Sequence, residues 1–294
     1  MSNGPSEACG SPQVEPHCVV CKHADSILTG TASAVPVGPK MIALAAEGSS
    51  RRIHDGVFEV NANRAVLWDM DGTLIDSGDL HWISWKNTLA NEGILITYGQ
   101  FLSSFGQRND SILLRWLGPG ATPERMEKIA NAKEELYRRR VRRNGISPLP
   151  GVANWLHRLH KEGRRQAIAS AAPRANIDAV LEALSATHFF QAIISAEDVH
   201  RGKPDPEVYL TAAARVGVPP ERCIVVEDAV AGIEGARRAG MRSIGVSRNG
   251  KHLPADVVVQ SLDLLEPDAF EQLNRSLLVG FGNRAAPSSN EIHV

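Results

Sequence analysis

The chain has 294 residues, of which 43% are hydrophobic and 22% are charged, and its formal net charge at pH 7 is −1. This length and apolar content suffice for the core of one large or two modest domains, and the near-zero charge argues against a general nucleic-acid binder. Because no apolar run approaches the length of a membrane span and four cysteines are too few for a disulfide scaffold, we expect a soluble, cytoplasmic monomer with no membrane or nucleic-acid partner.

Residues 1–60 are expected to form a disordered extension, because Gly, Ser, Pro and Ala are frequent there and apolar periodicity is weak. Cys18 and Cys21 lie among histidines and offer soft metal ligands, but the second ligand pair that a zinc site needs is missing. An ordered zinc site is therefore the less favoured alternative, and a chain that starts at Met41 is another. A tail over residues 279–294 is also expected to be disordered.

An apolar run over residues 65–68 predicts a short buried strand that stops at Asp69 and Asp71. Two residues apart on an extended chain, these carboxylates lie on one side and face the crevice where open α/β sheets bind ligands. One carboxylate can then attack an electrophile while the other moves protons, or both can hold a divalent cation. Gly72 lets the backbone turn sharply beyond them, and Thr73 adds a hydroxyl. A strand that merely ends in an acidic turn is the alternative.

Residues 79–147 are predicted to form a helix-rich insertion after this strand. The stretches 101–118 and 121–144 each carry apolar residues at helical spacing, and the second ends in basic residues that suit a helix C-terminus. Few runs in this region have the alternation of a strand. We therefore expect a helical unit inserted into an otherwise alternating pattern of strands and helices.

Four side chains of this insertion are candidates for a functional site. His81 and Trp85 lie four residues apart and are neighbours on one helix face, for which a core aromatic beside a partly buried histidine is the alternative. Arg108, in a loop that contains Gly106, can bind phosphate or sugar oxygens. Lys133 is a further candidate. For both cations an ordinary solvated side chain is the alternative.

The strand pattern resumes after a proline-containing turn at 148–151. Ser170 follows the first of the new strands and offers a hydroxyl and exposed backbone N–H groups, which are good phosphate donors. Serines end many strands, so a purely structural role is the alternative. Apolar runs predict these strands at residues 166–169, 192–195, 223–226, 243–246 and 256–259.

Lys203 lies in the sequence Gly-Lys-Pro-Asp-Pro, where a glycine and two prolines fix the backbone around it. A solvated surface lysine, which is the alternative, would not need such a backbone. A rigidly placed ammonium beside phosphate oxygens and a carboxylate nucleophile would reduce their repulsion and stabilise charge in the transition state. We therefore interpret Lys203 as a catalytic lysine.

Glu227 and Asp228 follow the apolar strand at 223–226 directly. Carboxylates at the end of a buried strand are costly unless a cation balances them. Oxygen ligands and a phosphate substrate suit Mg²⁺. The predicted magnesium ligands are Asp69, the backbone carbonyl of Asp71, Asp228 and, as a further contributor, Glu227.

Four stretches taken together resemble, in order, the motifs of the haloacid dehalogenase superfamily: DMDGTLIDS, the serine of AIASAAP, the lysine of GKPDPEVY and the acidic pair of CIVVEDAVAGIEGARRAG. The resemblance runs from about residue 64 to about residue 262 and is nearest to the β-phosphoglucomutase-like branch of sugar-phosphate mutases and small-molecule phosphatases. It implies a Rossmann-like α/β core, a parallel sheet with helices on both faces, over residues 61–78 and 148–278. A small α-helical cap domain would be inserted over residues 79–147.

The resemblance also implies roles for the candidate residues. Asp69 would attack the phosphorus of a monoester and Asp71 would protonate the leaving alcohol, while Ser170, Lys203 and Mg²⁺ hold the phosphate oxygens. His81, with Trp85 four residues on, would position Asp71 near the hinge of the cap. The residues assigned to the substrate side are Gly72, His81, Trp85, Arg108, Lys133, Ala171 and Asn176.

The expected function is a Mg²⁺-dependent phosphatase that hydrolyses a small phosphorylated metabolite, a sugar phosphate, through an aspartyl-phosphate. A β-phosphoglucomutase is the first alternative: the histidine, tryptophan and cations of the cap support it, while Ala172 and the short loop around Gly106 weaken it. A non-catalytic sensor of phosphorylated ligands is the second alternative. The complete set of acidic, serine and lysine motif residues argues against that sensor.

Overall fold

The computed structural model describes residues 63–281, with side chains described as far as residue 275. The expectations for residues 1–60, including the zinc alternative, and for the tail from residue 282 onward therefore lie outside the described residues. The last described helix, α10, continues to Phe281, beyond the predicted end of the core at residue 278, because apolar residues keep recurring at helical spacing in its sequence.

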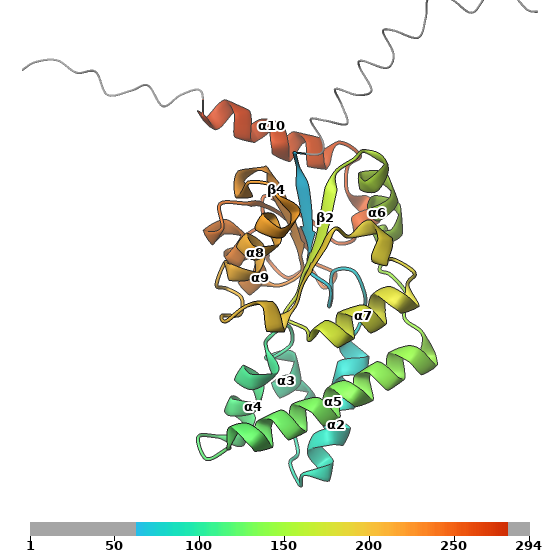
Figure 1. Ribbon diagram of the computed structural model, residues 1–294, viewed down its shortest axis with the longest axis vertical. Helices are drawn as coiled ribbons and strands as arrows, with labels where there is room; N and C mark the ends of the chain where they lie inside the picture. Colours follow the sequence, from blue (N-terminus) through green and yellow to red (C-terminus); the bar gives the residue numbers. More distant parts are fainter. Residues whose placement is uncertain (1–62, 282–294) are drawn as a thin grey trace, which may run out of the picture. The chain divides into compact units, whose positions relative to one another are not determined.

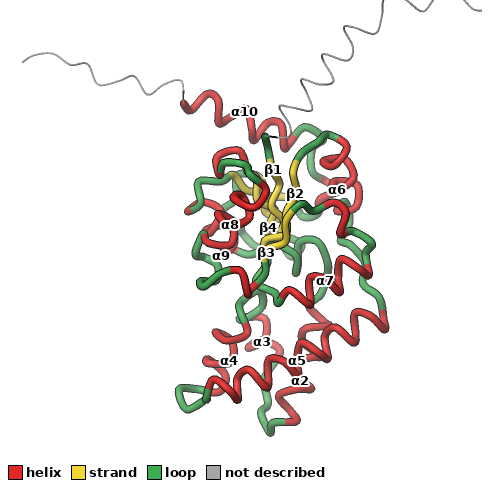
Figure 2. The backbone as a smooth tube through the Cα atoms, viewed as in Figure 1, coloured by secondary structure: helices red, strands yellow, loops and turns green. Residues whose placement is uncertain are grey.

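Within the described residues, six strands form one sheet in the order β3-β2-β1-β4-β5-β6, and every pair is parallel. The predicted α/β fold with a Rossmann-like parallel sheet is confirmed. The chain winds outward from β1 in one direction and then from β4 in the other (Figure 2), so the crevice at their carboxyl ends is a topological switch point. The strands are β1 (Ala65–Trp68), β2 (Arg165–Ala169), β3 (Ala192–Ile194), β4 (Cys223–Glu227), β5 (Arg242–Val246) and β6 (Val257–Val259).

Helices cover both faces of this sheet (Figure 1). Val66 and Trp68 of β1 face one hydrophobic cluster, and Ala65 and Leu67 face the other. A strand buried on both faces reads as a continuous apolar run, which is why β1 was recognisable in the sequence. The first cluster is covered by α6 (Val152–Lys161), α7 (Arg174–Ala183) and α10 (Ala269–Phe281), and the second by α8 (Glu207–Val216) and α9 (Val230–Arg238). Short 3₁₀ turns join these elements: η1 (Thr187–Phe189), η2 (Ala196–Asp198), η3 (Pro220–Arg222) and η4 (Leu262–Leu264).

The segment between β1 and β2 is helical, as the sequence predicts. Its helices are α2 (Gly78–Asn91), α3 (Tyr98–Leu102), α4 (Asn109–Leu117) and α5 (Pro123–Asn144). They enclose a hydrophobic cluster of their own, to which Trp85, Phe101, Ile112 and Ile129 contribute. The boundaries of a separate cap domain stay a prediction. None of the helices in the described part of the chain has the length and apolarity to cross a membrane.

The stretch 101–118 is not one continuous helix. Helix α3 ends at Leu102, Gly106 adopts a φ of +81°, and α4 begins only at Asn109. A positive φ ends a right-handed helix and is accessible to glycine at little cost. The loop between α3 and α4 carries Arg108, whose extended backbone precedes α4.

Helix α5 joins the two parts of the molecule. Ile129, near its start, packs in the cluster of the inserted helices, whereas Tyr137 and Val141, near its end, pack in a cluster of the sheet. Thr122 caps its N-terminus by accepting a hydrogen bond from the Arg125 N–H. Side chains in the middle of α5 therefore lie where the inserted helices meet the core.

Gly151 offers a test of the packing between α6 and η4. It precedes α6 with a φ of +83°, and an added Cβ would lie 2.2 Å from the backbone N of Asp263. Gly151→Ala is expected to lower the free energy of unfolding by roughly 3–5 kcal/mol, because backbone strain and overpacking add. Gly240→Ala is the matched control, since Gly240 has a φ of +74° and open space around its Cα, and should cost only about 1–2 kcal/mol. Denaturant titration measures both, and equal losses would contradict the packing argument.

Candidate active site

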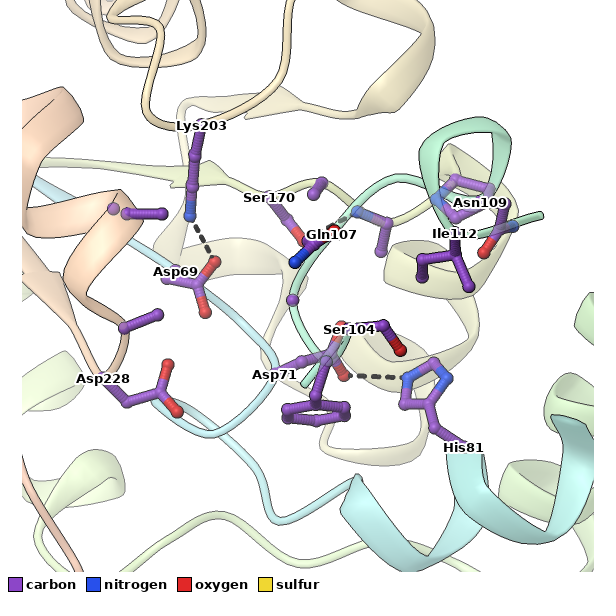
Figure 3. Close-up of a pocket in the computed structure, with 18 of the residues that line it drawn as sticks. Asp69, Asp71, His81, Ser104, Gln107, Asn109, Ile112, Ser170, Lys203 and Asp228 are labelled. Carbon is purple, nitrogen blue, oxygen red and sulfur yellow. Dashed lines mark hydrogen bonds and ion pairs between the residues drawn. The ribbon is translucent and has the colours of Figure 1, made fainter. Parts of the chain in front are cut away.

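The predicted catalytic side chains meet at the carboxyl ends of neighbouring strands. Asp69 and Asp71 follow β1, Ser170 follows β2, and Asp228 follows β4. Lys203 comes from the loop after β3 and η2 and points at Asp69 (Figure 3). These residues, with Glu227 and side chains of α2 to α5, line one cavity of about 130 Å³. The structure thus brings together groups that are up to 159 positions apart, from Asp69 to Asp228.

Lys203 is held between two carboxylates. Its Nζ donates to Oδ1 of Asp69 at 2.5 Å and to Oε1 of Glu227 at 2.7 Å. The Tyr209 hydroxyl donates to the same Glu227 oxygen at 3.3 Å. Burial alone would lower the pKa of Lys203, but attraction from Asp69 and Glu227 outweighs it and raises the pKa well above its ordinary value. The side chain therefore remains a fixed ammonium beside Asp69.

Glu227 is fixed by its own surroundings. Its Oε2 accepts a hydrogen bond from the Ala229 N–H at 2.6 Å, and the side chain is buried. Gly232 on α9 makes room for it, since an added Cβ there would lie 1.8 Å from Oε1 of Glu227. The carboxylate can therefore hold Lys203 in place only because position 232 carries no side chain.

Three carboxylates form a cluster that can hold a metal ion. Asp69, Glu227 and Asp228 each offer an oxygen, and these atoms lie within 4.8 Å of one another. Burial raises the pKa of Asp69 to about 7 and that of Asp228 to about 9; repulsion from Glu227 adds to both, and Lys203 offsets part of the rise. A divalent cation on these oxygen ligands would add positive charge beside the carboxylates.

Gly72 contributes to this cluster through its backbone and does not line the cavity. Its φ is +93°, and an added Cβ would lie 2.1 Å from Oδ2 of Asp228. The glycine lets the turn after β1 approach the carboxylate of Asp228 closely. The assignment of Gly72 to the substrate side stays a prediction. The predicted role of the Asp71 backbone carbonyl as a metal ligand stays a prediction.

Asp71 is not a member of this cluster, and its donors are Ser77, just before α2, and His81 on α2. Its Oδ1 accepts from the Ser77 hydroxyl at 2.5 Å and from Nε2 of His81 at 3.2 Å. Lys133 Nζ donates to Nδ1 of His81 at 2.8 Å, so the proton of a neutral imidazole sits on Nε2 and faces Asp71. Burial would raise the pKa of Asp71, but His81, Ser77 and Lys133 together bring it below its ordinary value.

The chain of polar contacts continues from Lys133 into the core. Lys133 Nζ also donates to Oε1 of Glu134 at 2.8 Å and lies 4.9 Å from the ring centroid of Trp85. Glu134 accepts from Asn109 at 2.7 Å and from Asn176 at 2.5 Å. The predicted residues His81, Trp85 and Lys133 therefore line the cavity as parts of one network, and Ala171 lines it from the core.

Two predicted substrate contacts lie elsewhere. Arg108 donates from one guanidinium nitrogen to the carbonyls of Ala196 and Val199, at 2.7 and 3.0 Å. Asn176 is fully buried and bonds to Glu134 and Arg138. Neither residue lines the cavity, because each is engaged in a contact between the inserted helices and the core.

Sequence reasoning missed several residues of the site. Ser77 precedes α2 without capping it, and its hydroxyl binds Asp71 instead; a serine just before a predicted helix start was the available signal. Glu134 is buried in a helix whose many charges suggested a solvated surface, so no pattern marked it. The other lining residues to which the sequence had assigned no role include Phe101, Ser104, Phe105, Asn109, Ile112, Pro173, Ala229 and Ala231, whereas Gly106 and Gln107 belong to the predicted loop that carries Arg108.

A family model described as haloacid dehalogenase-like hydrolase matches residues 66–246. This range contains all the strand ends that carry the acidic, serine and lysine side chains. The chain belongs to this family. The membership predicted from the four motifs is confirmed.

Relatives of this chain include both mutases and phosphatases. It is 34% identical over 217 residues to the β-phosphoglucomutase of Bacillus subtilis, covering 68% of this chain and 91% of that protein. It is 30% identical over 185 residues to the fructose-1-phosphate phosphatase YqaB of Escherichia coli, covering 62% and 95%. The solved β-phosphoglucomutase of Clostridium difficile matches with a TM-score of 0.67 and 27% identity over 74% of this chain and 99% of that one. These similarities to mutases and phosphatases show that the chain belongs among enzymes.

The space at Gly232 provides a test of the site. In Gly232→Ala the added carbon would displace the Glu227 carboxylate, so Lys203 would lose one of its two anionic partners. Turnover is expected to fall about 100-fold, because a misplaced charge no longer stabilises the transition state.

Gly120→Ala is the control for Gly232→Ala. Gly120 has no atom within 4 Å of an added Cβ and no positive φ. Its turnover should stay within about twofold of the parent enzyme, as for an ordinary surface substitution. Steady-state kinetics measures both variants, and full activity in Gly232→Ala would contradict the role assigned to Glu227.

Proposed function

We propose that the protein is a Mg²⁺-dependent phosphomonoester hydrolase that acts on a small sugar phosphate through an aspartyl-phosphate on Asp69. The observation that carries this proposal is the separation of two carboxylates into different surroundings. Asp69 lies against the ammonium of Lys203, whereas Asp71 is bound by Ser77 and His81. Asp69 is placed beside a positive charge that attracts phosphate, which suits a nucleophile. Asp71 is placed beside hydrogen-bond donors that influence its protonation, which suits an acid and base.

In the first half-reaction an oxygen of Asp69 attacks the phosphorus, the bond from phosphorus to the ester oxygen breaks, and Asp71 gives that oxygen a proton. In the second, Asp71 takes a proton from water, the water oxygen attacks the phosphorus, and the bond to Asp69 breaks to release inorganic phosphate. The contacts of Asp71 with Ser77 and His81 favour its ionised form, which is the form in which the second half-reaction starts. The proton that Asp71 then takes from water is the one that it gives to the ester oxygen in the next turnover.

The remaining residues bind and compensate charge. Lys203 is placed to attract a phosphoryl oxygen beside Asp69. The Ser170 oxygen accepts from the Ala172 N–H at 3.1 Å, which leaves the hydroxyl proton for a second phosphoryl oxygen. Mg²⁺ held by Asp69 and Asp228, with Glu227 nearby, would neutralise further phosphate charge. Positioning and charge compensation supply most of the catalysis in such phosphoryl transfers.

A β-phosphoglucomutase is the second candidate. In that reaction a sugar phosphate, not water, would accept the phosphoryl group from Asp69. The relative of Bacillus subtilis at 34% identity favours this candidate, and the phosphatase of Escherichia coli at 30% identity favours the first. The two differ in the acceptor alone, so they require separate assays.

Asp69→Asn tests the proposal. Phosphate release from a panel of sugar phosphates and from p-nitrophenyl phosphate, with Mg²⁺ present, is expected to fall at least about a thousandfold, because the amide cannot act as nucleophile. Circular dichroism checks that the variant is folded. Glucose 6-phosphate formed from β-glucose 1-phosphate with little free phosphate would favour the mutase. No turnover of any ester by the parent protein would favour a non-catalytic sensor.

Metal binding can be tested without turnover. Mg²⁺ should raise the melting temperature, since it binds a carboxylate cluster that exists only in the folded protein. Free Mg²⁺ at ten times its dissociation constant would add about 1.4 kcal/mol, which corresponds to roughly 3 °C in Tm for a chain of this size. Asp228→Asn removes one ligand and should abolish the shift in differential scanning fluorimetry. The same rise in parent and variant would contradict the assigned site.

A further inference from the structure

We propose that the substrate carries a single phosphate and that the part of it facing the inserted helices is uncharged. The inference rests on the proposed function and narrows its substrate class. It is drawn from the side chains that line the cavity beyond Asp69 and from the contacts that occupy every nearby cation.

Besides His81, Lys133 and Glu134, the inserted helices and their loop contribute uncharged side chains to the cavity. The apolar ones are Trp85, Phe101, Phe105 and Ile112. The polar ones are Ser104, Gln107 and Asn109 (Figure 3). Much of the hydrogen-bonding capacity of these polar groups is already used. Ser104 donates to the carbonyl of Phe101, and Gln107 accepts from Arg115. This part of the lining suits a compact group of modest polarity.

Lys133 and Lys203 are the lysines that line the cavity, and no arginine of the described residues does so. Both ammonium groups are occupied. Lys203 bonds to Asp69 and Glu227, at the end where the transferring phosphate binds. Lys133 is buried and bonds to Glu134 and to Nδ1 of His81. Neither lysine is available to a second phosphate at the far end.

Arg108, at the end of the loop between α3 and α4, lines a neighbouring cavity and not this one. Its guanidinium donates to the carbonyls of Ala196 and Val199 in the core and to the carboxylate of Asp110. Its aliphatic stem lies 3.1 Å from where a Cβ on Gly202 would sit. Arg108 thus ties the loop between α3 and α4 to the segment that leads into Lys203.

A second phosphate would therefore meet an unfavourable surrounding. It would lie among aromatic rings and near the carboxylate of Glu134, with no unpaired cation among the lining residues. Burial of an unpaired dianion is strongly unfavourable. A neutral hydroxylated or alkyl group has no such penalty and gains from apolar contact.

The lack of an unpaired cation among the described lining residues also affects which molecule can accept the phosphoryl group. A mutase that works through Asp69 must bind a sugar phosphate with its own phosphate directed away from Asp69, because an acceptor hydroxyl has to face the aspartyl-phosphate. That far position offers no free cation in the described part of the chain. Water is then the acceptor that this cavity favours.

The test compares esters that differ only in a second phosphate. Fructose 1-phosphate is paired with fructose 1,6-bisphosphate, and glucose 1-phosphate with glucose 1,6-bisphosphate, under saturating Mg²⁺. Within each pair, kcat/KM is expected to be at least about tenfold higher for the monophosphate, the size of effect that one unfavourable contact gives. An equal or higher value for the bisphosphates would overturn the inference.

Arg108→Ala separates a structural contact from a phosphate ligand. If Arg108 ties the loop to the core, kcat/KM falls by the same factor for both members of a pair and for p-nitrophenyl phosphate, so their ratio is unchanged. If Arg108 binds a distal phosphate, the loss falls on the bisphosphate alone, and the inference is overturned.

Gln107→Lys adds an ammonium at a position that lines the cavity. It is expected to raise kcat/KM for the bisphosphate relative to the monophosphate, since it supplies the missing cation. Gln107→Met, of similar length and without charge, is the control and should leave the ratio as in the parent. If Gln107→Lys leaves the ratio of kcat/KM for bisphosphate to monophosphate unchanged, the missing cation is not what makes the cavity select monophosphates.

The baseline is release of phosphate from p-nitrophenyl phosphate in parent and Asp69→Asn proteins. No Asp69-dependent release from this ester or from any sugar phosphate would overturn the proposed function and this inference with it. Asp69-dependent release with a bisphosphate preference that disappears in Arg108→Ala would overturn the inference alone and leave the hydrolase standing.

Discussion

The ion pair of Lys203 with Asp69 and Glu227 is the interaction on which the site depends. Strands β1 and β4 are neighbours, and the Asp69 N–H donates to the Val226 carbonyl at 3.0 Å, so their acidic ends are forced together. Repulsion among buried carboxylates would oppose this arrangement without a cation. Glycines at 72 and 232 give the carboxylates room. The fold tolerates this concentration of negative charge because the Lys203 ammonium lies between two of the carboxylates.

A buried polar network connects this centre with the inserted helices. It runs from Asp71 through His81, Lys133 and Glu134 to Asn176 on α7. Every link is within hydrogen-bond distance, and α5 carries two of the members in its middle, where it passes from one hydrophobic cluster to the other. Lys133, a residue of the inserted helices, therefore determines which ring nitrogen of His81 carries the proton. The position of these helices and the hydrogen bonding of Asp71 are linked in this way.

The sequence predicted the strands and the groups at their ends because both signals are local. An apolar run of four residues followed by Asp-x-Asp is visible in the first motif. The glycine and prolines around Lys203 indicate just as directly that its backbone is fixed. The partners of Arg108 and Asn176 were not predictable in this way. Arg108 binds a carbonyl 88 positions away, and such contacts are set by how the inserted helices pack on the core. The burial of Glu134 could not be predicted, because a buried charged residue and a solvated one look alike in the sequence until their partners are known.

Catalysis and selectivity in this cavity have one physical origin. In the proposed mechanism, aromatic side chains of the inserted helices line the same cavity as Asp69 and Lys203, and their low polarity would strengthen the attraction between the ammonium and a phosphoryl group. The same low polarity penalises any further charge that arrives without a partner. A cation placed among these side chains would accept larger anions, but it would also compete with Lys203 for the phosphate to be transferred. Arg108, held on the carbonyls of Ala196 and Val199, ties the loop between α3 and α4 to the core and does not add its positive charge to the lining of the cavity.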